Sequence, residues 1–353
     1  MVSKKKFKEI CQLLGEEPKL IYDGKNSSVF ETKNKQVVKC VKDKYFFHRE
    51  VGGYDLLLPY FKNHLPKRNC VNTELLTITY EMIDLPSFQQ ILLDKKDSNK
   101  KRILKSYRIF LNEVFQVVLS SRVEKIPHKN SKYFYNTNWH IDKLSKTNYL
   151  FVFGNESITA REFFARAISI EGQHYLSINS SLETAKQVYE NARPCSSVVI
   201  HGDENNTNIF IDLLKPEKWF LIDPQWSVNG ADWVVLVLEL FNGWRKYLLS
   251  EVNNSVSVEL SKKNEIVIRY DLSENNWPIL REMDSLLFAK ANECSKLLGD
   301  GTWFQRFKSF YLYKSIRGGI WGHLGNPIIT AVSTGEGLRI FGSQNSSQVL
   351  EGL

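Results

Sequence analysis

The sequence lacks the features that identify a disulfide-stabilised, zinc-binding or membrane-spanning protein. Its five cysteines are an odd number, with no Cys-x-x-Cys spacing and no paired histidine cluster. Neither a disulfide framework nor a structural zinc site is supported. The most apolar run, WVVLVLELF at 233–241, is too short to cross a bilayer and contains Glu239. The sequence therefore predicts no membrane span, and it contains no internal repeat or long low-complexity tract.

The first residues, MVSKKKFKEICQLLGEE, do not read as a signal peptide. Their basic residues are followed by Phe7, Ile10, Cys11 and Leu14 at helical spacing, not by a continuous apolar segment. Together with the cysteine usage, this pattern predicts a cytoplasmic protein. The chain has 353 residues, 42% apolar and 24% charged, which is typical of a globular protein large enough for two lobes and a deep cleft.

The net charge of +8 raises the possibility of nucleic-acid binding, because a basic surface attracts phosphate backbones. The excess of positive charge lies largely in LLDKKDSNKKRILKSYR and the stretch after it, while the C-terminal part is mildly acidic. A run of this kind is usually a solvated loop and helix face. Nucleic acid is therefore not the expected partner, and the oligomeric state is left open.

The secondary-structure pattern changes near residue 85 and predicts an α+β protein. Residues 19–83 contain short runs rich in β-branched and aromatic residues, interrupted by one helix at 46–61. From 101–121 onward the apolar residues recur at helical spacing. We therefore expect a bilobal protein with a small, β-rich lobe at 1–83 and a larger, mostly helical lobe at 84–353.

The larger lobe is expected to contain an irregular insertion at 122–180, rich in Asn, Lys and aromatic residues, with one helix around 159–170. A helix at 181–192 precedes short apolar strands that form a hairpin-like unit, and further core-facing helices follow. The tail after Pro327 is rich in Gly, Ser and Asn, which predicts loose order. The helices expected after the hairpin are 232–244, 277–298 and 302–316.

Polar side chains gather at the ends of the strands in this hairpin-like unit. The segment VVIHGDENNTNIFI at 198–211 places His201, Asp203 and Asn208 between two apolar runs, and WFLIDPQ places Asp223 after the next one. Phosphoryl transfer needs a carboxylate to receive the acceptor proton and oxygen ligands to hold magnesium against the phosphates. A carboxylate, an amide five residues later and a second carboxylate supply these functions. The alternative is a polar turn in which Asp203 caps the local backbone.

The segments HGDENNTN and FLID resemble the His-x-Asp-x4-Asn catalytic loop and the Ile-Asp metal motif of the aminoglycoside phosphotransferase and choline kinase family. That family has a protein-kinase-like fold. The resemblance implies that Asp203 is the catalytic base, that Asn208 and Asp223 bind Mg²⁺, and that His201 braces the loop. Pro224 follows Asp223 where many kinases have Phe-Gly. The resemblance covers residues 19–245, although 90–195 matches only in order.

The N-terminal lobe provides candidates for binding the nucleotide. YDGKNSSVFET has Gly24, Ser27 and Ser28 at a strand bend, where backbone N–H groups could approach phosphate oxygens, although protein kinases have three glycines there. In QVVKCVK, Lys39 lies at an inward-facing strand position and is the candidate to pair with the nucleotide phosphates. Lys42 is the alternative candidate for that role. The candidates for this lobe are completed by Glu50, on the following helix, as the ion-pair partner of Lys39.

The segment TITYEMIDLPSF is expected to end the small lobe and lead into the linker. The resemblance implies that backbone groups near Glu81, Met82 and Ile83 hold the adenine edge, although a plain edge strand would have the same pattern. The acceptor site is not identified by the sequence. Two sets of candidates stay open, the acidic Glu274, Glu282, Asp284 and Glu293 and the insertion aromatics Tyr133, Phe134, Tyr135 and Trp139.

The leading hypothesis is an enzyme that uses ATP, or GTP, with Mg²⁺ to phosphorylate a hydroxyl of a small molecule. An aminoglycoside-like, choline-like or sugar-like acceptor is open. The single-glycine loop favours an alternative, a non-catalytic nucleotide-binding or scaffold protein with a kinase fold. A kinase that acts on protein is less favoured, because no activation segment with a Pro-Glu anchor follows Asp223.

Overall fold

The structure, a computed structural model, divides the chain into two compact units. It describes residues 4–94, 99–127, 131–147, 149–153, 155–194, 196–251, 256–261, 264–270, 278–322 and 327–351. The first unit comprises Met1–Val118 and Val199–Asn229, and the second comprises Leu119–Val198 and Gly230–Leu353. The lobe boundary expected at residue 83 is not tested by this division and stays a prediction.

The first unit contains a five-stranded antiparallel sheet with the strand order β1-β2-β3-β5-β4. In this sheet Lys39 lies opposite Val29 on one side and Ile78 on the other. Four of the strands coincide with the predicted apolar runs, whereas β4 has the polar, largely exposed sequence RNCVN and gave no signal. The strands are β1 (Lys19–Asp23), β2 (Ser27–Glu31), β3 (Gln36–Val41), β4 (Arg68–Asn72) and β5 (Thr77–Glu81).

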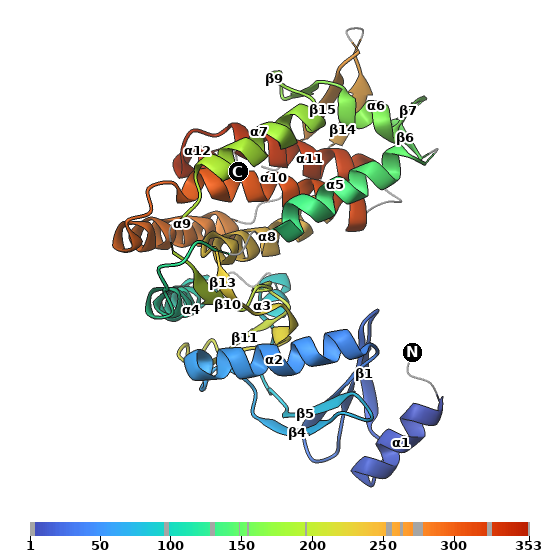
Figure 1. The fold of residues 1–353 in the computed structure, drawn as a ribbon, viewed down its shortest axis with the longest axis vertical. Helices are drawn as coiled ribbons and strands as arrows, with labels where there is room; N and C mark the ends of the chain where they lie inside the picture. The colour runs from blue at the N-terminus through green and yellow to red at the C-terminus, as the bar shows by residue number, and fades with distance from the viewer. Residues whose placement is uncertain are drawn as a thin grey trace. The chain divides into compact units, whose positions relative to one another are not determined.

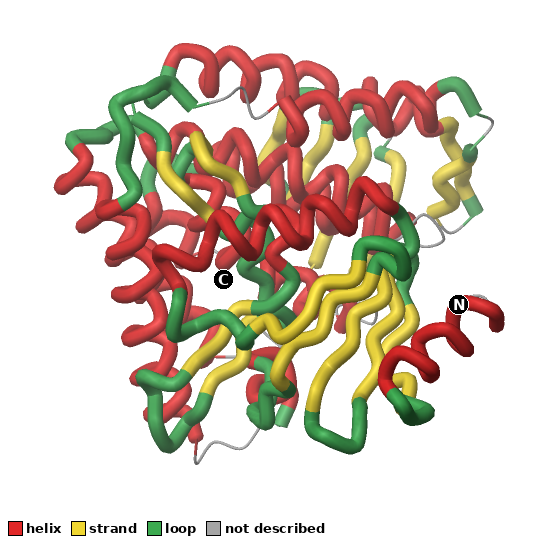
Figure 2. Tube along the Cα trace, turned by 60° about the horizontal axis from the view of Figure 1, so that its bottom comes forward, coloured by secondary structure: helices red, strands yellow, loops and turns green. Residues whose placement is uncertain are grey.

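Alternation along β3 separates its apolar residues from its lysine. Val38 and Cys40 are buried with Ile10 of α1 (Lys4–Leu14), so this helix covers one face of the sheet. Figure 2 shows α1 beside the yellow strands, close to the N-terminus. Because successive side chains point to opposite faces, Lys39 faces away from α1. It meets α2 (Lys44–Phe61), which runs along the sheet in Figure 1.

Helix α2 begins at its N-cap Asp43, whose side chain accepts a hydrogen bond from the Tyr45 N–H. Its buried side chains include Phe47, Glu50, Tyr54 and Leu57. Three of these four are apolar and anchor the helix on the sheet, so the one carboxylate among them is held in a largely apolar surrounding. The helix predicted at 46–61 is confirmed, and it begins two residues earlier, at Lys44.

The rest of the first unit supports a short antiparallel hairpin, β11–β12. Trp219 at the start of β12 is fully buried, and its Nε1–H donates to Glu113 Oε2 at 2.6 Å. The His64 ring stacks on Trp219 with centroids 3.8 Å apart, and the Leu221 N–H donates to His64 O at 2.8 Å. These contacts fix the hairpin to α4 and to the segment after α2. The elements are α3 (Phe88–Leu93), α4 (Lys100–Ser120), β11 (Ile209–Ile211), β12 (Trp219–Leu221) and a short 3₁₀ helix, η2 (Pro224–Trp226).

The second unit is mostly helical, with α10 packed against α5, α7, α8 and α11. Strands β10 (Val198–Ile200) and β13 (Val228–Ala231) lie where the chain passes between the units. The predicted helices after the hairpin are confirmed. The helices are α5 (Ser131–Ser145), α6 (Ala160–Ala165), α7 (Ile178–Asn191), α8 (Val234–Glu251), α9 (Pro278–Leu298), α10 (Trp303–Gly322), α11 (Pro327–Gly342) and α12 (Ser346–Glu351).

The interpretation of 122–180 as irregular is wrong, because this stretch contains α5 and four strands, one of which pairs with a distant segment. The helix expected around 159–170 is present as α6 (Ala160–Ala165). Strand β8 (Ile168–Ile170) pairs in parallel with β15 (Ile266–Tyr270) in a four-stranded sheet of order β14-β15-β8-β9. Ile168, Ile170 and two β15 isoleucines are buried in one apolar cluster. The other strands are β6 (Leu150–Phe153), β7 (Glu156–Thr159), β9 (Gln173–Tyr175) and β14 (Val256–Leu260).

The expectation of a loosely ordered tail after Pro327 is also wrong. Helix α11 begins at Pro327, at a position where proline suits a helix start, and Ala331, Val332 and Leu338 bury its apolar side in the same cluster. Gly335 and Gly337 lie inside the helix, where the absence of a Cβ allows neighbouring side chains to pack closely. Within the described residues, no helix is both long and apolar enough to span a membrane.

A buried ionic network ties α10 to the start of α8. Arg306 is fully buried, and its guanidinium binds Asp232 Oδ2 at 2.8 Å and Asp300 Oδ2 at 2.5 Å. The Trp233 Nε1–H donates to the same Asp300 oxygen at 2.8 Å. Because a buried charge is tolerated only when paired, these contacts specify how the helices meet.

Candidate functional site

The loop between β10 and β11 is shaped by its own side chains, which accept hydrogen bonds from its backbone N–H groups. Both oxygens of the buried Glu204 carboxylate are used, at 3.0 Å from His201 N and 3.1 Å from Gly202 N. Gly202 has a φ of 79°, and a Cβ there would overlap the Trp226 carbonyl oxygen. The His201 Nε2 lies 2.9 Å from Ile222 O, so this nitrogen donates to the carbonyl. This hydrogen bond joins the loop to the residue that follows β12, and the bracing role of His201 stays a prediction.

The asparagines of this loop orient Asp203. Asn205 Nδ2 donates to Asp203 Oδ1 at 2.9 Å, and Asn208 Nδ2 donates to Asp203 Oδ2 at 3.0 Å. Asn205 is held in turn by Thr207, whose N–H donates to Asn205 Oδ1 at 2.9 Å. The Asp203 carboxylate is therefore fixed between the side-chain amides of Asn205 and Asn208.

Asn208 and Asp223 are brought together by the β11–β12 hairpin. The Ile222 N–H donates to Asn208 O at 3.0 Å, which places Asp223 one residue beyond this bond. Asp223 has a φ of 64° and a ψ of 56°, a left-handed conformation that is uncommon for a residue with a side chain. Such backbone conformations persist where the surrounding structure fixes them, often at functional sites.

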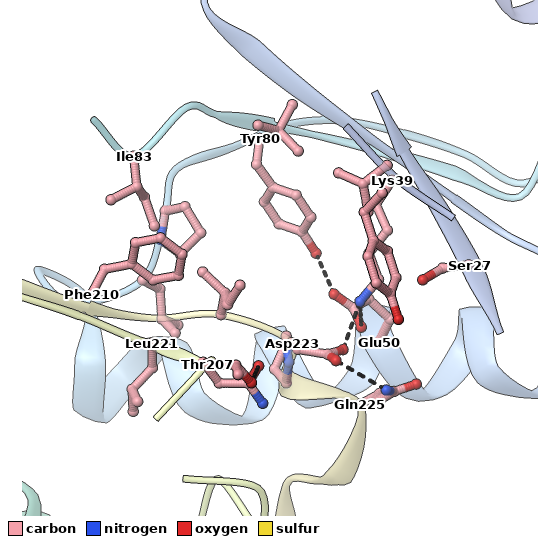
Figure 3. Close-up of a pocket in the computed structure, with 18 of the residues that line it drawn as sticks. Ser27, Lys39, Glu50, Tyr80, Ile83, Thr207, Phe210, Leu221, Asp223 and Gln225 are labelled. Carbon is pink, nitrogen blue, oxygen red and sulfur yellow. Dashed lines mark hydrogen bonds and ion pairs between the residues drawn. The ribbon is translucent and has the colours of Figure 1, made fainter. Parts of the chain in front are cut away.

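Lys39, Glu50 and Asp223 form a compact charged cluster, shown in Figure 3. The Lys39 Nζ lies 2.7 Å from Glu50 Oε2 and 2.6 Å from Asp223 Oδ1. Lys39 comes from β3, Glu50 from α2, and Asp223 from the segment after β12. Three elements distant in sequence therefore meet at one ammonium group.

The electrostatics of this cluster keep the lysine charged. Burial alone would lower the pKa of Lys39, but the Glu50 and Asp223 carboxylates raise it above its ordinary value. Burial raises the pKa of Glu50 to about 7, although Lys39 opposes this shift. Burial also favours the neutral form of Asp223, yet Lys39 holds the pKa of that carboxyl below its usual range. Asp223 and Lys39 are thus both ionised at neutral pH.

A cavity of about 770 Å³ opens beside the cluster, entirely within the first unit. Its volume is within the usual range of small-molecule sites, roughly 300–1,000 Å³. Asp203, Asn208, Asp223 and Lys39 line it together with apolar side chains from the sheet and the hairpin. Ile83, Phe210 and Leu221 are labelled among them in Figure 3. The cavity therefore has an apolar part suited to a planar ring and a charged part next to it.

The segment after β5 also lines this cavity, through Glu81, Met82 and Ile83. The Glu81 N–H already donates to Lys67 O at 2.9 Å, and the Met82 N–H donates to Lys35 O at 3.0 Å. Among the described residues, none accepts a hydrogen bond from the Ile83 N–H. Of the three amides, that of Ile83 is the one left for a ligand.

The β1–β2 bend is closed by a side-chain clamp. Lys42 Nζ lies 2.9 Å from Asp23 Oδ1 and also donates to the Gly24 carbonyl, while Ser28 Oγ donates to the same Asp23 oxygen at 2.6 Å. Ser27 lines the cavity, whereas Gly24 and Ser28 are not among its lining residues. Lys42, the rival of Lys39, is therefore engaged at the bend, and the phosphate role of all three bend residues stays a prediction.

The atoms available to a metal ion are oxygens. Asn208 Nδ2 is turned toward Asp203, which directs its Oδ1 away from that carboxylate, and Asp223 supplies a carboxylate. Amide and carboxylate oxygens are ligands that suit Mg²⁺. No group of three or more His, Cys, Asp and Glu side chains gathers within the part of the chain that the structure describes. Asn208 and Asp223 thus fit a magnesium ion by their donor chemistry.

The acceptor candidates that the structure describes lie in the second unit, on α9 and α5. Asp284 is buried in α9, and Glu293 is an exposed residue paired with Lys290 at 3.0 Å. Glu282 is exposed on the same helix, and Trp139 is 45% exposed on α5. Four candidates lie outside the residues or side chains that the structure describes, namely Tyr133, Phe134, Tyr135 and Glu274.

Several residues of this site were not found from the sequence. Tyr80, Phe210 and Leu221 line the cavity, but in the sequence they read as ordinary buried strand residues. Glu204 is fixed by two backbone N–H groups, a role that a turn-rich motif does not reveal. The run of polar residues at 203–208 was the available signal for Asn205.

No protein-family model and no curated protein matches the sequence. Solved structures match its fold. A choline/ethanolamine kinase family protein from Mesorhizobium loti is 10% identical with a TM-score of 0.52, covering 99% of this chain and 96% of that chain. A thermostable mutant of aminoglycoside phosphotransferase APH(4)-Ia, in ternary complex with ADP and hygromycin B, is 10% identical with a TM-score of 0.52 and covers 98% of each chain.

The GDP complex of wild-type aminoglycoside 2'-phosphotransferase-IIIa is 11% identical, with a TM-score of 0.50 and coverage of 100% of each chain. The neighbours are consistent with the family resemblance of HGDENNTN and FLID. At these identities the likeness concerns the fold. The α+β class expected from the sequence is confirmed, and the chain has the protein-kinase-like fold of these phosphotransferases.

Proposed function

We propose that this protein transfers the γ-phosphoryl group of ATP or GTP to a hydroxyl group of a small molecule, with Mg²⁺ as cofactor. The observation that carries the proposal is the position of Lys39, whose Nζ lies within 2.7 Å of both Glu50 and Asp223 at the wall of a cavity that Asp203 and Asn208 also line. An ammonium ion, two oxygen ligands and an oriented carboxylate are the groups that phosphoryl transfer requires.

Each residue has a distinct task in this proposal. Lys39 binds phosphate oxygens of the nucleotide, and Glu50 keeps it in place. The base occupies the apolar part of the cavity, with the Ile83 N–H as a donor to its edge. When bound by Asn208 and Asp223, Mg²⁺ supplies positive charge at the phosphates.

Asp203 is the general base for the acceptor hydroxyl. Its carboxylate is held by two amide donors, Asn205 and Asn208, so its orientation is set before a substrate arrives. A base so positioned takes the proton as the hydroxyl oxygen forms its bond to the γ-phosphorus, while the bond from that phosphorus to the nucleoside diphosphate breaks and the diphosphate leaves. Its loop is fixed by Glu204 and His201.

The acceptor class is the finer part of the proposal. The structural neighbours include proteins named as choline/ethanolamine kinase family and aminoglycoside phosphotransferase, so amino alcohols and aminoglycosides are the first classes to test, followed by sugars.

The test is a screen of nucleotide consumption against these three classes, with ATP and with GTP, in Mg²⁺ and in EDTA. The proposal predicts that ADP or GDP forms only with Mg²⁺ and only with one acceptor class. The phosphorylated acceptor should be identified by mass spectrometry. Asp203→Asn should bind the nucleotide but lose transfer by about a hundredfold or more. Nucleotide binding without transfer to any acceptor would instead favour the non-catalytic alternative, and full activity of Asp203→Asn would remove that residue from the mechanism.

A further inference from the structure

The Glu50 carboxylate is shared between two donors, one on each oxygen. Its Oε2 accepts from Lys39 Nζ at 2.7 Å, and its Oε1 accepts from the Tyr80 hydroxyl at 3.2 Å. Figure 3 shows the tyrosine reaching down from the sheet to this carboxylate. Glu50 is only 1% exposed, so the loss of either donor would leave a buried carboxylate oxygen without its hydrogen bond from the protein.

Tyr80 is itself held rigidly. It lies on β5, is 7% exposed, and packs its ring on that of Tyr54 with centroids 5.9 Å apart. The Tyr54 hydroxyl donates to Pro66 O at 3.1 Å and accepts from Arg68 N, and the Arg68 guanidinium lies over the Tyr54 ring. Tyr80 is therefore carried by β5 and packed against Tyr54 of α2, and these contacts restrict where its hydroxyl can lie.

The chemistry of the hydroxyl suits a permanent donor. Burial, with the neighbouring Glu50 carboxylate, raises the pKa of Tyr80 well above its ordinary value, so the phenol keeps its proton. In this hydrogen bond the Tyr80 O–H donates and Glu50 Oε1 accepts.

We propose that Tyr80 is a positioning residue for nucleotide binding, which fixes Glu50 from the sheet so that Glu50 presents Lys39 to the phosphates. The inference rests on the proposed function, because it assigns phosphate binding to Lys39. Tyr80 acts through Glu50 and Lys39 and need not touch the phosphates. Its hydroxyl should therefore matter for nucleotides that carry phosphates and not for nucleosides.

The test compares wild type with Tyr80→Phe by isothermal titration calorimetry, using MgATP and MgGTP and also adenosine and guanosine. Tyr80→Phe should raise the Kd of the bound triphosphate about tenfold, the effect of losing one hydrogen bond to a charged group, and leave the nucleoside Kd unchanged. In a Glu50→Ala background the same substitution should have no further effect on triphosphate affinity. Tyr107→Phe is the matched control, because Tyr107 is buried in α4 and is not among the residues lining the cavity.

Equal weakening of triphosphate and nucleoside, or an unchanged triphosphate Kd, would overturn the inference and leave the proposed function standing. Wild-type protein that binds neither triphosphate overturns the proposed function and the inference with it. If Tyr80→Phe does not fold, 4-aminophenylalanine at position 80, which keeps a donor in the same place, should bind triphosphate as wild type does. A tenfold loss in that folded variant contradicts the positioning role.

Discussion

Gly53 in the middle of α2 lies in direct contact with Pro224, the residue after Asp223, because a Cβ at position 53 would overlap the Pro224 carbonyl oxygen. The helix that carries Glu50 and the segment that carries Asp223 are thereby held against each other at a position where only glycine fits. In the sequence, the adjacent Gly52 and Gly53 weaken the prediction of a helix. In the structure, the close approach at Gly53 helps to bring the carboxylates of Glu50 and Asp223 to Lys39.

Gly53→Ala should therefore force α2 and the Pro224 segment apart. We expect a loss of about 1–3 kcal/mol in the free energy of unfolding, as for other overpacked sites, and weaker triphosphate binding. The control is Gly52→Ala, because a Cβ at Gly52 meets no atom within 4 Å. That variant should be more stable by about 0.5–1 kcal/mol, since alanine is the better helix former. Urea unfolding measures both, and equal effects at the two positions would contradict the contact.

The two lysines of the β3 region should have separable roles. Lys39→Met should weaken triphosphate binding while the bend at 23–28 keeps its protection from hydrogen exchange. Lys42→Met removes the clamp on Asp23 and Gly24, so amide exchange at the bend should become faster. Exchange measured by mass spectrometry on both variants is decisive, and the reverse assignment would follow if Lys42→Met alone lost nucleotide affinity.

The clamp at Asp23 should be insensitive to pH over the neutral range. Hydrogen bonds from Ser28 and Lys42 hold the pKa of Asp23 well below its usual range. A carboxylate whose pKa is lowered on folding contributes above its unfolded pKa, and the contribution is lost as pH falls through the lower folded pKa. Exchange at the bend, corrected for the intrinsic pH dependence, should thus stay constant from pH 5 to 8, and a rise within that window would show that the clamp opens there.

Asn208 and Asn205 should differ in their link to magnesium. Asn208→Ala removes a proposed ligand oxygen, so the Mg²⁺ concentration needed for half-maximal triphosphate binding should rise about tenfold or more, the lower end of the effect of losing metal-site contacts. Asn205→Ala also removes a donor to Asp203, but Asn205 Oδ1 accepts from the Thr207 N–H at 2.9 Å, whereas Asn208 Oδ1 has only a 3.4 Å contact with the Thr207 hydroxyl. The Mg²⁺ requirement of Asn205→Ala should therefore stay as in wild type. Titration of Mg²⁺ at constant nucleotide tests this, and an equal shift in both variants would exclude Asn208 as a ligand.

The buried pair of Arg306 and Asp300 should dominate the electrostatic contribution to stability in the second unit. Asp300→Asn leaves the fully buried Arg306 with less compensation, and we expect a loss of about 3 kcal/mol in the free energy of unfolding at pH 7. Burial opposes ionisation of Asp300, but Arg306 and Trp233 more than offset it and hold its pKa below the ordinary value. The loss should therefore begin to shrink below about pH 4, where the unfolded chain protonates this carboxyl, and vanish only below the lower pKa of the folded protein.

The control for this prediction is Glu259→Gln, since Glu259 and Arg269 form an ion pair with both side chains more than half exposed. An exposed pair contributes about 0–1 kcal/mol, so this variant should unfold almost as wild type does. Equal losses in the two variants, or a loss in Asp300→Asn that is constant down to pH 2, would show that burial does not set the strength of the Arg306 network.

The sequence predicts those parts of the fold that depend on local patterns. Alternation in QVVKCVK places Lys39 on the face of the strand away from Val38 and Cys40. The helical spacing after this strand places Glu50 on the next helix. The parallel pairing of Ile168 with Ile266 could not be predicted, because the two residues are 98 positions apart and neither short strand has a strong pattern of its own. Tyr80 was missed for a related reason, since its partner Glu50 lies on α2, 30 positions earlier in the chain.

The central claim is that Lys39, held by Glu50 and Asp223, binds the phosphates of a magnesium nucleotide in the cavity of the first unit. Calorimetric titration of wild type, Lys39→Met and Lys42→Met with non-hydrolysable analogues of ATP and GTP in Mg²⁺ tests it most directly. The account predicts saturable binding of one analogue per chain by wild type and Lys42→Met, and affinity at least tenfold weaker in Lys39→Met. Wild type that binds neither analogue, or Lys39→Met that binds as tightly as wild type, would contradict it.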